Sequence, residues 1–188
     1  MREFLIVILT ACVVMVGESL AQGYGPADEA RDFGIEARSD LRTAEHSAAT
    51  PLALPGGRTI STPALRELIV NSTEGRQPLM IDVLGGSGHS TIPGTVWLPD
   101  AGRGSSFEDA LQLRLAQTLQ VLTGADRTRA LAFFCQGPRC WLSYNAALRA
   151  IKLGYSDVYW YRGGIEAWLA AGGSLMPPRV AWERPPQD

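Results

Sequence analysis

Two cysteines lie five positions apart in the stretch FFCQGPRC, residues 133–140, and they are the residues best suited to covalent chemistry. Cys135 directly follows a run of strand-forming residues, and Cys140 precedes a helical pattern. A thiol at such a junction faces backbone amides of the loop and of the helix N-terminus. Those amides lower the pKa of a thiol and favour the nucleophilic thiolate. The pattern therefore predicts a reactive cysteine at position 135.

The loop after Cys135 is also a candidate anion-binding segment. Successive backbone amides can cradle an oxyanion such as thiosulfate, sulfate or phosphate, and the planar guanidinium of Arg139 suits the same ligand. The less specific alternatives are that Cys135 is only a small core residue and that Arg139 is a solvated loop charge. The expected segment consists of Gln136, Gly137, Pro138, Arg139, Cys140 and Trp141.

Cys140 decides whether Cys135 acts as a free thiolate. If the loop curls, the two α-carbons approach within the roughly 4.4–6.8 Å that a disulfide requires. The pair is then a static disulfide that staples the loop, or an exchange pair in which Cys140 resolves. A third alternative is an inert cysteine that caps the helix. The spacing leaves these alternatives open.

Three other polar residues are candidates to support the site. Asp82 ends an apolar run, where it either accepts hydrogen bonds near the site or caps its own strand. His89 and Arg162 are expected to approach the same edge, although a mobile loop histidine and a surface arginine are the plainer interpretations. The two histidines, His46 and His89, lack the close spacing of a zinc site, and copper bound by the cysteines is a minor alternative. We therefore expect no metal and no cofactor.

The first residues are typical of an export signal. An apolar run over residues 4–17 is followed by small residues at Ser19 and Ala21. This pattern predicts a cleaved signal peptide at residues 1–21 and a periplasmic protein. The alternatives are a retained anchor and lipid attachment at Cys12. In an oxidising compartment, the two cysteines that remain after cleavage are a candidate disulfide.

Composition argues against two classes of partner. The net charge is −2, and a single lysine, Lys152, stands among 17 scattered basic residues. No clustered basic stripe marks a binder of nucleic acid or of an anionic membrane. The hydrophobic fraction of 46% and the charged fraction of 19% are those of an ordinary globular protein. We expect no nucleic acid and, after cleavage of the signal, no membrane contact.

Short apolar runs alternate with helical patterns along the chain. This alternation predicts an α/β fold, with a mainly parallel sheet of about five strands and helices on both faces. Ligands of such sheets bind at the carboxyl ends of strands, which is where Cys135 lies. The expected strands are 79–85, 95–99, 129–135 and 157–161, and the expected helices begin at Thr62, after Ser106, near Cys140 or Trp141, and at Ile165.

The predicted domain has a segment on either side. Residues 22–57 are polar, rich in alanine and interrupted by prolines, which indicates an extension or a partly ordered wrap. Residues 58–175 form the predicted globular domain. Residues 176–188 are proline-rich, and we expect a loose tail.

Four fragments in order resemble the rhodanese-like domain family: LMIDVLGG, IPGTVWLP, FFCQGPRC and LGYSDVYWYRGGIEAWLAAG. The resemblance covers residues 58–175 and implies a single-domain rhodanese-like α/β fold. It further implies that Cys135 carries sulfur as a persulfide. The sulfur would come from a small sulfur-donor anion and pass to a thiol or a protein acceptor.

The chain departs from the usual family pattern at two places. Leu84 stands where the arginine of the usual Asp-Val-Arg strand would be, and the stretch from Cys135 to the LGY turn is longer than usual, which implies an enlarged loop or an extra turn. A longer loop is a feature of the phosphatase branch, but Arg139 does not hold the position of that branch's arginine. The position of Arg139 therefore argues against a phosphatase.

A narrower resemblance concerns CWLSYNAALRA and GYSDVYWYRGGIEAW. They are similar to exported bacterial proteins whose family name refers to PQQ-dependent catabolism and a CXXCW motif, although here the spacing is Cys-x-x-x-x-Cys-Trp. This resemblance implies a link to a quinoprotein dehydrogenase system. Three functions remain open: a sulfurtransferase, a non-catalytic accessory or binding module with a structural Cys135–Cys140 disulfide, and a thiol–disulfide exchange protein.

Overall fold

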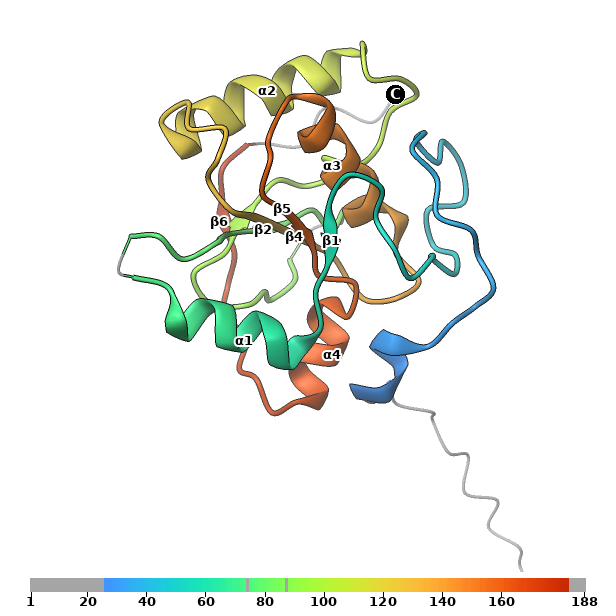
Figure 1. The fold of residues 1–188 in the computed structure, drawn as a ribbon, viewed down its shortest axis with the longest axis vertical. Coiled ribbons are helices and arrows are strands. Elements are labelled where there is room, and N and C mark those ends of the chain that lie inside the picture. The colour runs from blue at the N-terminus through green and yellow to red at the C-terminus, as the bar shows by residue number, and fades with distance from the viewer. Residues whose placement is uncertain (1–25, 74, 87, 183–188) are drawn as a thin grey trace, which may run out of the picture.

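A computed structural model of the chain describes residues 26–73, 75–86 and 88–182. The predicted signal peptide at 1–21 lies outside these residues. A six-stranded sheet with the order β1-β5-β4-β2-β3-β6 forms the centre of the molecule (Figure 1). Its strands are β1 (Arg58–Thr59), β2 (Leu79–Asp82), β3 (Val96–Trp97), β4 (Leu131–Phe134), β5 (Val158–Trp160) and β6 (Arg179–Val180).

All strand pairings in the sheet are parallel, which confirms the predicted mainly parallel α/β architecture. The central strand β4 is buried at all four positions, as its uninterrupted apolar sequence requires in a sheet covered on both faces. The sheet has six strands rather than about five. Two of the strands, β1 and β6, are not among the four ranges predicted from the sequence, and β6 comes from the segment expected to be a loose tail.

Two helices cover each face of the sheet (Figure 1). Helices α1 (Thr62–Asn71) and α4 (Gly164–Ala170) lie on one face, and α2 (Ala110–Thr123) and α3 (Trp141–Lys152) on the other. Side chains of β4 alternate between the two cores, so that Phe134 packs on the α1–α4 side and Phe133 on the α2–α3 side. Cys135 continues this alternation and belongs to the α2–α3 core.

Helix α1 begins at Thr62, as expected, and Ser61 is its N-cap. Helix α2 begins at Ala110, later than the start expected after Ser106, and Asp109 is its N-cap. Asp109 Oδ1 accepts a hydrogen bond of 2.8 Å from the backbone N–H of Gln112. An aspartate competes well for this role because its carboxylate also interacts favourably with the helix dipole.

The N-terminal extension packs on α3 after a short 3₁₀ helix, η1 (Pro26–Ala30) (Figure 1). Three α3 side chains donate hydrogen bonds to its backbone carbonyls. The Tyr144 hydroxyl donates to Arg38 at 2.7 Å, the Asn145 amide to Arg42 at 2.8 Å and the Trp141 indole to Ala49 at 2.9 Å. These donors lie at i, i+3 and i+4, on one side of the helix.

The tail differs from the loose segment that the sequence predicts. Met176 forms an antiparallel bridge with Thr91, and β6 pairs in parallel with β3. Trp182 is 7% exposed, and its indole donates a hydrogen bond of 3.1 Å to the carbonyl of Pro99. The sequence does not indicate this strand, because β6 spans only two residues and directly follows two prolines, which are typical of irregular segments. Among the described residues, no helix has the length and apolar character needed to cross a bilayer.

We expect the substitution Trp182→Ala to lower the free energy of unfolding by about 3 kcal/mol, because it removes a large buried side chain from the sheet edge. Urea denaturation monitored by circular dichroism measures this difference. Val180→Ala is the control, since Val180 is 50% exposed and its loss should cost about 0.5 kcal/mol or less. Equal effects of the two substitutions would contradict a structural role for the tail.

Candidate active site

Cys135 and Cys140 form a disulfide at the carboxyl edge of the sheet, with their α-carbons 6.4 Å apart. Cys135 is the first residue after β4, and Cys140 is the N-cap of α3. Their exposed fractions are 1% and 8%. The disulfide that the spacing allowed is therefore present, and the predicted start of the helix at Cys140 or Trp141 is confirmed.

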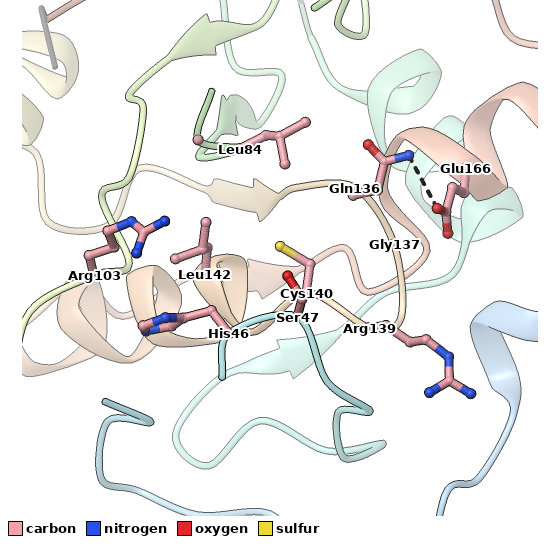
Figure 2. Close-up of a pocket in the computed structure, with 11 residues that line it drawn as sticks. His46, Ser47, Leu84, Arg103, Gln136, Gly137, Arg139, Cys140, Leu142 and Glu166 are labelled. Carbon is pink, nitrogen blue, oxygen red and sulfur yellow. Dashed lines mark hydrogen bonds between the residues drawn. The ribbon is translucent and has the colours of Figure 1, made fainter. Parts of the chain in front are cut away.

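A pocket of about 470 Å³ opens in front of the disulfide (Figure 2). Cys140 forms part of its wall, whereas Cys135 does not line the pocket and lies behind Cys140, to which the disulfide joins it. Figure 2 shows the Cys140 sulfur in the middle of the lining residues, with Arg103 and His46 at one end and Gln136 and Glu166 at the other. The wall consists of His46, Ser47, Leu84, Gly85, Arg103, Gln136, Gly137, Arg139, Cys140, Leu142 and Glu166.

The cysteine loop is held from two sides. The N-terminal turn of α4 donates two backbone hydrogen bonds of 3.0 Å, from Ile165 to the carbonyl of Cys135 and from Glu166 to that of Gln136. On the other side, the Thr50 hydroxyl of the extension donates to the carbonyl of Pro138 at 2.7 Å. The loop is therefore built into the fold, and its curl brings Cys140 back to Cys135.

Glycine is required where α4 meets this loop. Gly164 has a φ of 58°, in the left-handed region that side chains disfavour. A Cβ at this position would also collide with the carbonyl oxygen of Cys135. The Gly-Gly pair of the sequence thus allows α4 to begin against the cysteine loop.

Ser143 is a site residue that was not among those predicted from the sequence. Its hydroxyl lies 3.1 Å from Cys135 Sγ and accepts a hydrogen bond of 3.0 Å from the indole N–H of Trp160. The hydroxyl donates a long hydrogen bond of 3.4 Å to the carbonyl of Cys140, and a small rotation would direct its hydrogen to Sγ instead. Such a donor stabilises a thiolate at Cys135. Its position in the first turn of α3, after a strand-end cysteine, was the available signal.

We expect Ser143→Ala, in a Cys140→Ser background, to raise the pKa of the Cys135 thiol, because the thiolate loses a hydrogen-bond donor. Thiolate absorbance as a function of pH measures this value. Ser143→Thr keeps the hydroxyl and is the matched control. An unchanged pKa in the alanine variant would exclude the hydroxyl as a thiolate donor.

The two predicted anion-binding arginines contact the extension instead of the pocket centre. The guanidinium of Arg139 points away from the pocket and stacks on the ring of Phe33, 4.8 Å from its centroid (Figure 2). Arg162 is 1% exposed and donates hydrogen bonds to the carbonyls of Glu29, Arg31 and Thr50. The sequence could not indicate these contacts because the partners lie more than 100 positions away in the extension.

Asp82 and His89 form a pair of their own. Asp82 is fully buried, and its carboxylate accepts hydrogen bonds of 2.8 Å from the backbone N–H of Leu84 and 2.7 Å from the hydroxyl of Thr91. His89 Nε2 lies 2.7 Å from the same carboxylate. Asp82 projects to the same face of the sheet as Met80 and Phe134. Those two residues belong to the α1–α4 core, on the opposite face from Cys135. The pair fixes the β2–β3 connection, and the expected mobile histidine is instead fastened to it.

Charged groups lie at the two ends of the pocket. Burial and the nearby Arg103 lower the pKa of His46, whose Nε2 atom is buried and has no hydrogen-bond partner among the described residues. Burial raises the pKa of Glu166, although its hydrogen bond of 3.1 Å from Gln136 acts in the opposite direction. His46 also caps α3, since its carbonyl accepts a hydrogen bond of 2.8 Å from the backbone N–H of Trp141.

The pocket thus places the Cys135–Cys140 disulfide at the wall of a small, partly open space. Its size falls in the range of small-molecule sites. Within residues 26–73, 75–86 and 88–182, no three His, Cys, Asp or Glu side chains come together in a way that could hold a metal ion. The groups present are suited to nucleophilic sulfur chemistry.

Comparison with known families gives one match. The Rhodanese-like domain matches residues 72–171, which is more than half of the chain. None of the curated proteins searched matches this chain.

Several solved structures are similar to the chain. Thiosulfate sulfurtransferase from Pseudomonas aeruginosa is 18% identical, with a TM-score of 0.48, and the match covers 66% of this chain and 21% of that protein. This chain therefore spans about a fifth of the length of that protein. A human single-domain sulfurtransferase is 29% identical, with a TM-score of 0.41, over 60% of this chain and 96% of that one.

Proposed function

This chain belongs to the rhodanese-like domain family, and from that membership we propose that it is a sulfurtransferase that carries sulfane sulfur on Cys135. The observation that carries the proposal is the position of Cys135. It leaves the central strand β4 beneath the N-terminus of α3, with a hydroxyl 3.1 Å from its sulfur. An oxyanion donor such as thiosulfate would enter through the pocket in front of it.

The disulfide makes this activity dependent on reduction. A thiol reductant must first attack the Cys140 sulfur in the pocket wall, so that Cys135 leaves as the thiolate. This thiolate attacks the outer sulfur of thiosulfate, forms a Cys135 persulfide and releases sulfite. A thiol acceptor then attacks the outer sulfur of the persulfide, takes that sulfur and restores the Cys135 thiolate.

The presence of the disulfide favours thiol–disulfide exchange as a second candidate function. In that case the pair only passes electrons, and Cys135 never holds a third sulfur atom. A permanently closed disulfide would correspond to the accessory or binding module, with the pocket as a docking site. We further propose that the protein is exported to the periplasm, because residues 1–21 have the pattern of a cleaved signal peptide. We also propose that it serves PQQ-dependent catabolism, on the resemblance of its Cys-Trp helix and its aromatic β5 segment.

Sulfite release distinguishes these functions. The protein is reduced, freed of reductant without oxygen, and mixed with thiosulfate and an excess of an acceptor thiol. If the protein is a sulfurtransferase, we expect it to release sulfite over many turnovers. As a control, protein kept as the disulfide in the absence of thiols should release none. If fully reduced protein also releases no sulfite, the sulfurtransferase proposal is overturned, and disulfide exchange or docking remains.

A further inference from the structure

The two sulfur atoms of the site differ in depth. Cys135 is 1% exposed and is enclosed by β4, Ser143 and the first turn of α3, whereas Cys140 contributes to the pocket wall. The native loop nevertheless brings the two atoms into a covalent bond. A persulfide on Cys135 would therefore form beside a second thiol that reaches its inner sulfur without any rearrangement of the fold.

We propose that Cys140 is a resolving thiol that converts the Cys135 persulfide into free hydrosulfide and the Cys135–Cys140 disulfide. This inference rests on the proposed sulfur transfer to Cys135 and adds an activity to it. The protein then reduces sulfane sulfur to the level of sulfide with its own two thiols. The disulfide of the structure is the oxidised product of this reaction.

The reaction balances with the groups at the site. The Cys135 thiolate first attacks thiosulfate, which breaks the sulfur–sulfur bond of the donor and releases sulfite. The Cys140 thiolate, after loss of its proton, then attacks Cys135 Sγ. The bond between the inner and outer sulfurs breaks, and the outer sulfur leaves with the bonding electron pair and takes up that proton as hydrosulfide. Two electrons pass from the two cysteines to the sulfane sulfur.

The depth of the sulfurs also determines how the protein returns to the dithiol state. An external thiol in the pocket meets Cys140 first, because Cys135 lies behind it. Its attack forms a mixed disulfide at Cys140 and expels Cys135 as the thiolate. The Ser143 hydroxyl lies 3.1 Å from this leaving sulfur. A hydroxyl that turns its hydrogen toward the thiolate would stabilise it, and a stabilised thiolate leaves faster. A second external thiol then releases Cys140.

Competition from an external acceptor is limited by geometry. Cys140 needs no diffusion step, since it is fixed within bonding reach of Cys135 by the loop, the extension and α4. Intramolecular attack by a positioned group has an effective concentration far above that of ordinary cellular thiols. Resolution by Cys140 should therefore outpace transfer to an external acceptor at low thiol concentration.

A single-turnover experiment tests the inference. Fully reduced, reductant-free protein is mixed with an equal amount of thiosulfate in the absence of oxygen. Sulfite, hydrosulfide and protein thiols are then measured. For the wild type we expect one sulfite, one hydrosulfide and the loss of two thiols per chain. For Cys140→Ser we expect the same sulfite but no hydrosulfide, with one additional sulfur atom on the peptide that contains Cys135.

The outcomes separate this inference from the proposal on which it rests. Absence of sulfite from both proteins overturns the sulfur transfer itself. Sulfite from both, together with a lasting persulfide and no hydrosulfide in the wild type, overturns the resolving role and leaves the sulfurtransferase intact. A persulfide found on Cys140 would also overturn the inference, since it would mean that Cys140 attacks the outer sulfur and relays it. The sulfite released by Cys140→Ser shows at the same time that this variant is folded.

Discussion

Replacing Cys135 with Ser is expected to lower the rate of sulfite release from thiosulfate by at least about 10³-fold, which is the usual consequence of removing a catalytic nucleophile. A serine hydroxyl at the end of β4 is close in size to the thiol but is scarcely ionised near neutral pH, so it offers thiosulfate no nucleophilic anion. The rate is measured with reduced protein, thiosulfate and an excess of acceptor thiol.

Cys140→Ser is the matched control for this substitution, because it also removes the disulfide but leaves Cys135 free. We expect it to release sulfite at a rate within about threefold of the reduced wild type, and to need no prior reduction. If instead Cys140→Ser lost activity and Cys135→Ser retained it, the nucleophile would be the sulfur in the pocket wall. The assignment of Cys135 would then be wrong.

Arg162→Met is expected to have the largest effect on the extension, lowering the free energy of unfolding by about 3 kcal/mol. The substitution keeps most of the side-chain volume but removes the donors to the carbonyls of Glu29, Arg31 and Thr50. Thr50 is fully buried, so its carbonyl loses a partner where water cannot replace it. Urea denaturation measures the stability, and limited proteolysis shows whether residues 26–57 detach.

Arg139→Met is the control for that experiment. Arg139 stacks on the same Phe33 ring as Arg162, with its guanidinium 4.8 Å rather than 5.1 Å from the centroid, but its side chain is exposed. We expect a change of about 0.5 kcal/mol or less, since the contact of an exposed cation with a ring is weak. An equally large loss in both variants would place the anchor of the extension on Phe33 rather than on the buried hydrogen bonds.

The extension contributes both to the stability of the fold and to the wall of the pocket. Its residues His46 and Ser47 form one side of the pocket, and the His46 carbonyl caps α3 beside Cys140. Loosening the extension through Arg162 should therefore open the disulfide to external thiols. The pocket wall, in this account, is completed by a segment that precedes the matched family region at residues 72–171.

The parts of the site that could be predicted from the sequence are those fixed by local patterns. The apolar run of β4 and the helical pattern of α3 placed Cys135 and Cys140 at one strand–helix junction, and their short separation allowed the disulfide. Period and spacing act over a few residues, so they can be recognised in a single chain.

The parts that were missed depend on contacts between distant segments. Nothing near Arg162 or Arg139 in the sequence shows that their partners are in the extension. The sequence places Ser143 only in the first turn of a helix, and its contact with Trp160 of β5 follows from the fold. Trp182 follows two prolines and an exposed strand of two residues, and only pairing with β3 buries it.

The central claim is that reduced Cys135 accepts a sulfur atom, and the intact mass of the protein under thiol alkylation tests it most directly. Reduced Cys140→Ser is treated with thiosulfate, and its mass and its Cys135 peptide are measured before and after addition of an acceptor thiol. We expect a gain of one sulfur atom on the Cys135 peptide, which the acceptor removes. An alkylatable Cys135 that gains no sulfur from thiosulfate would contradict the claim.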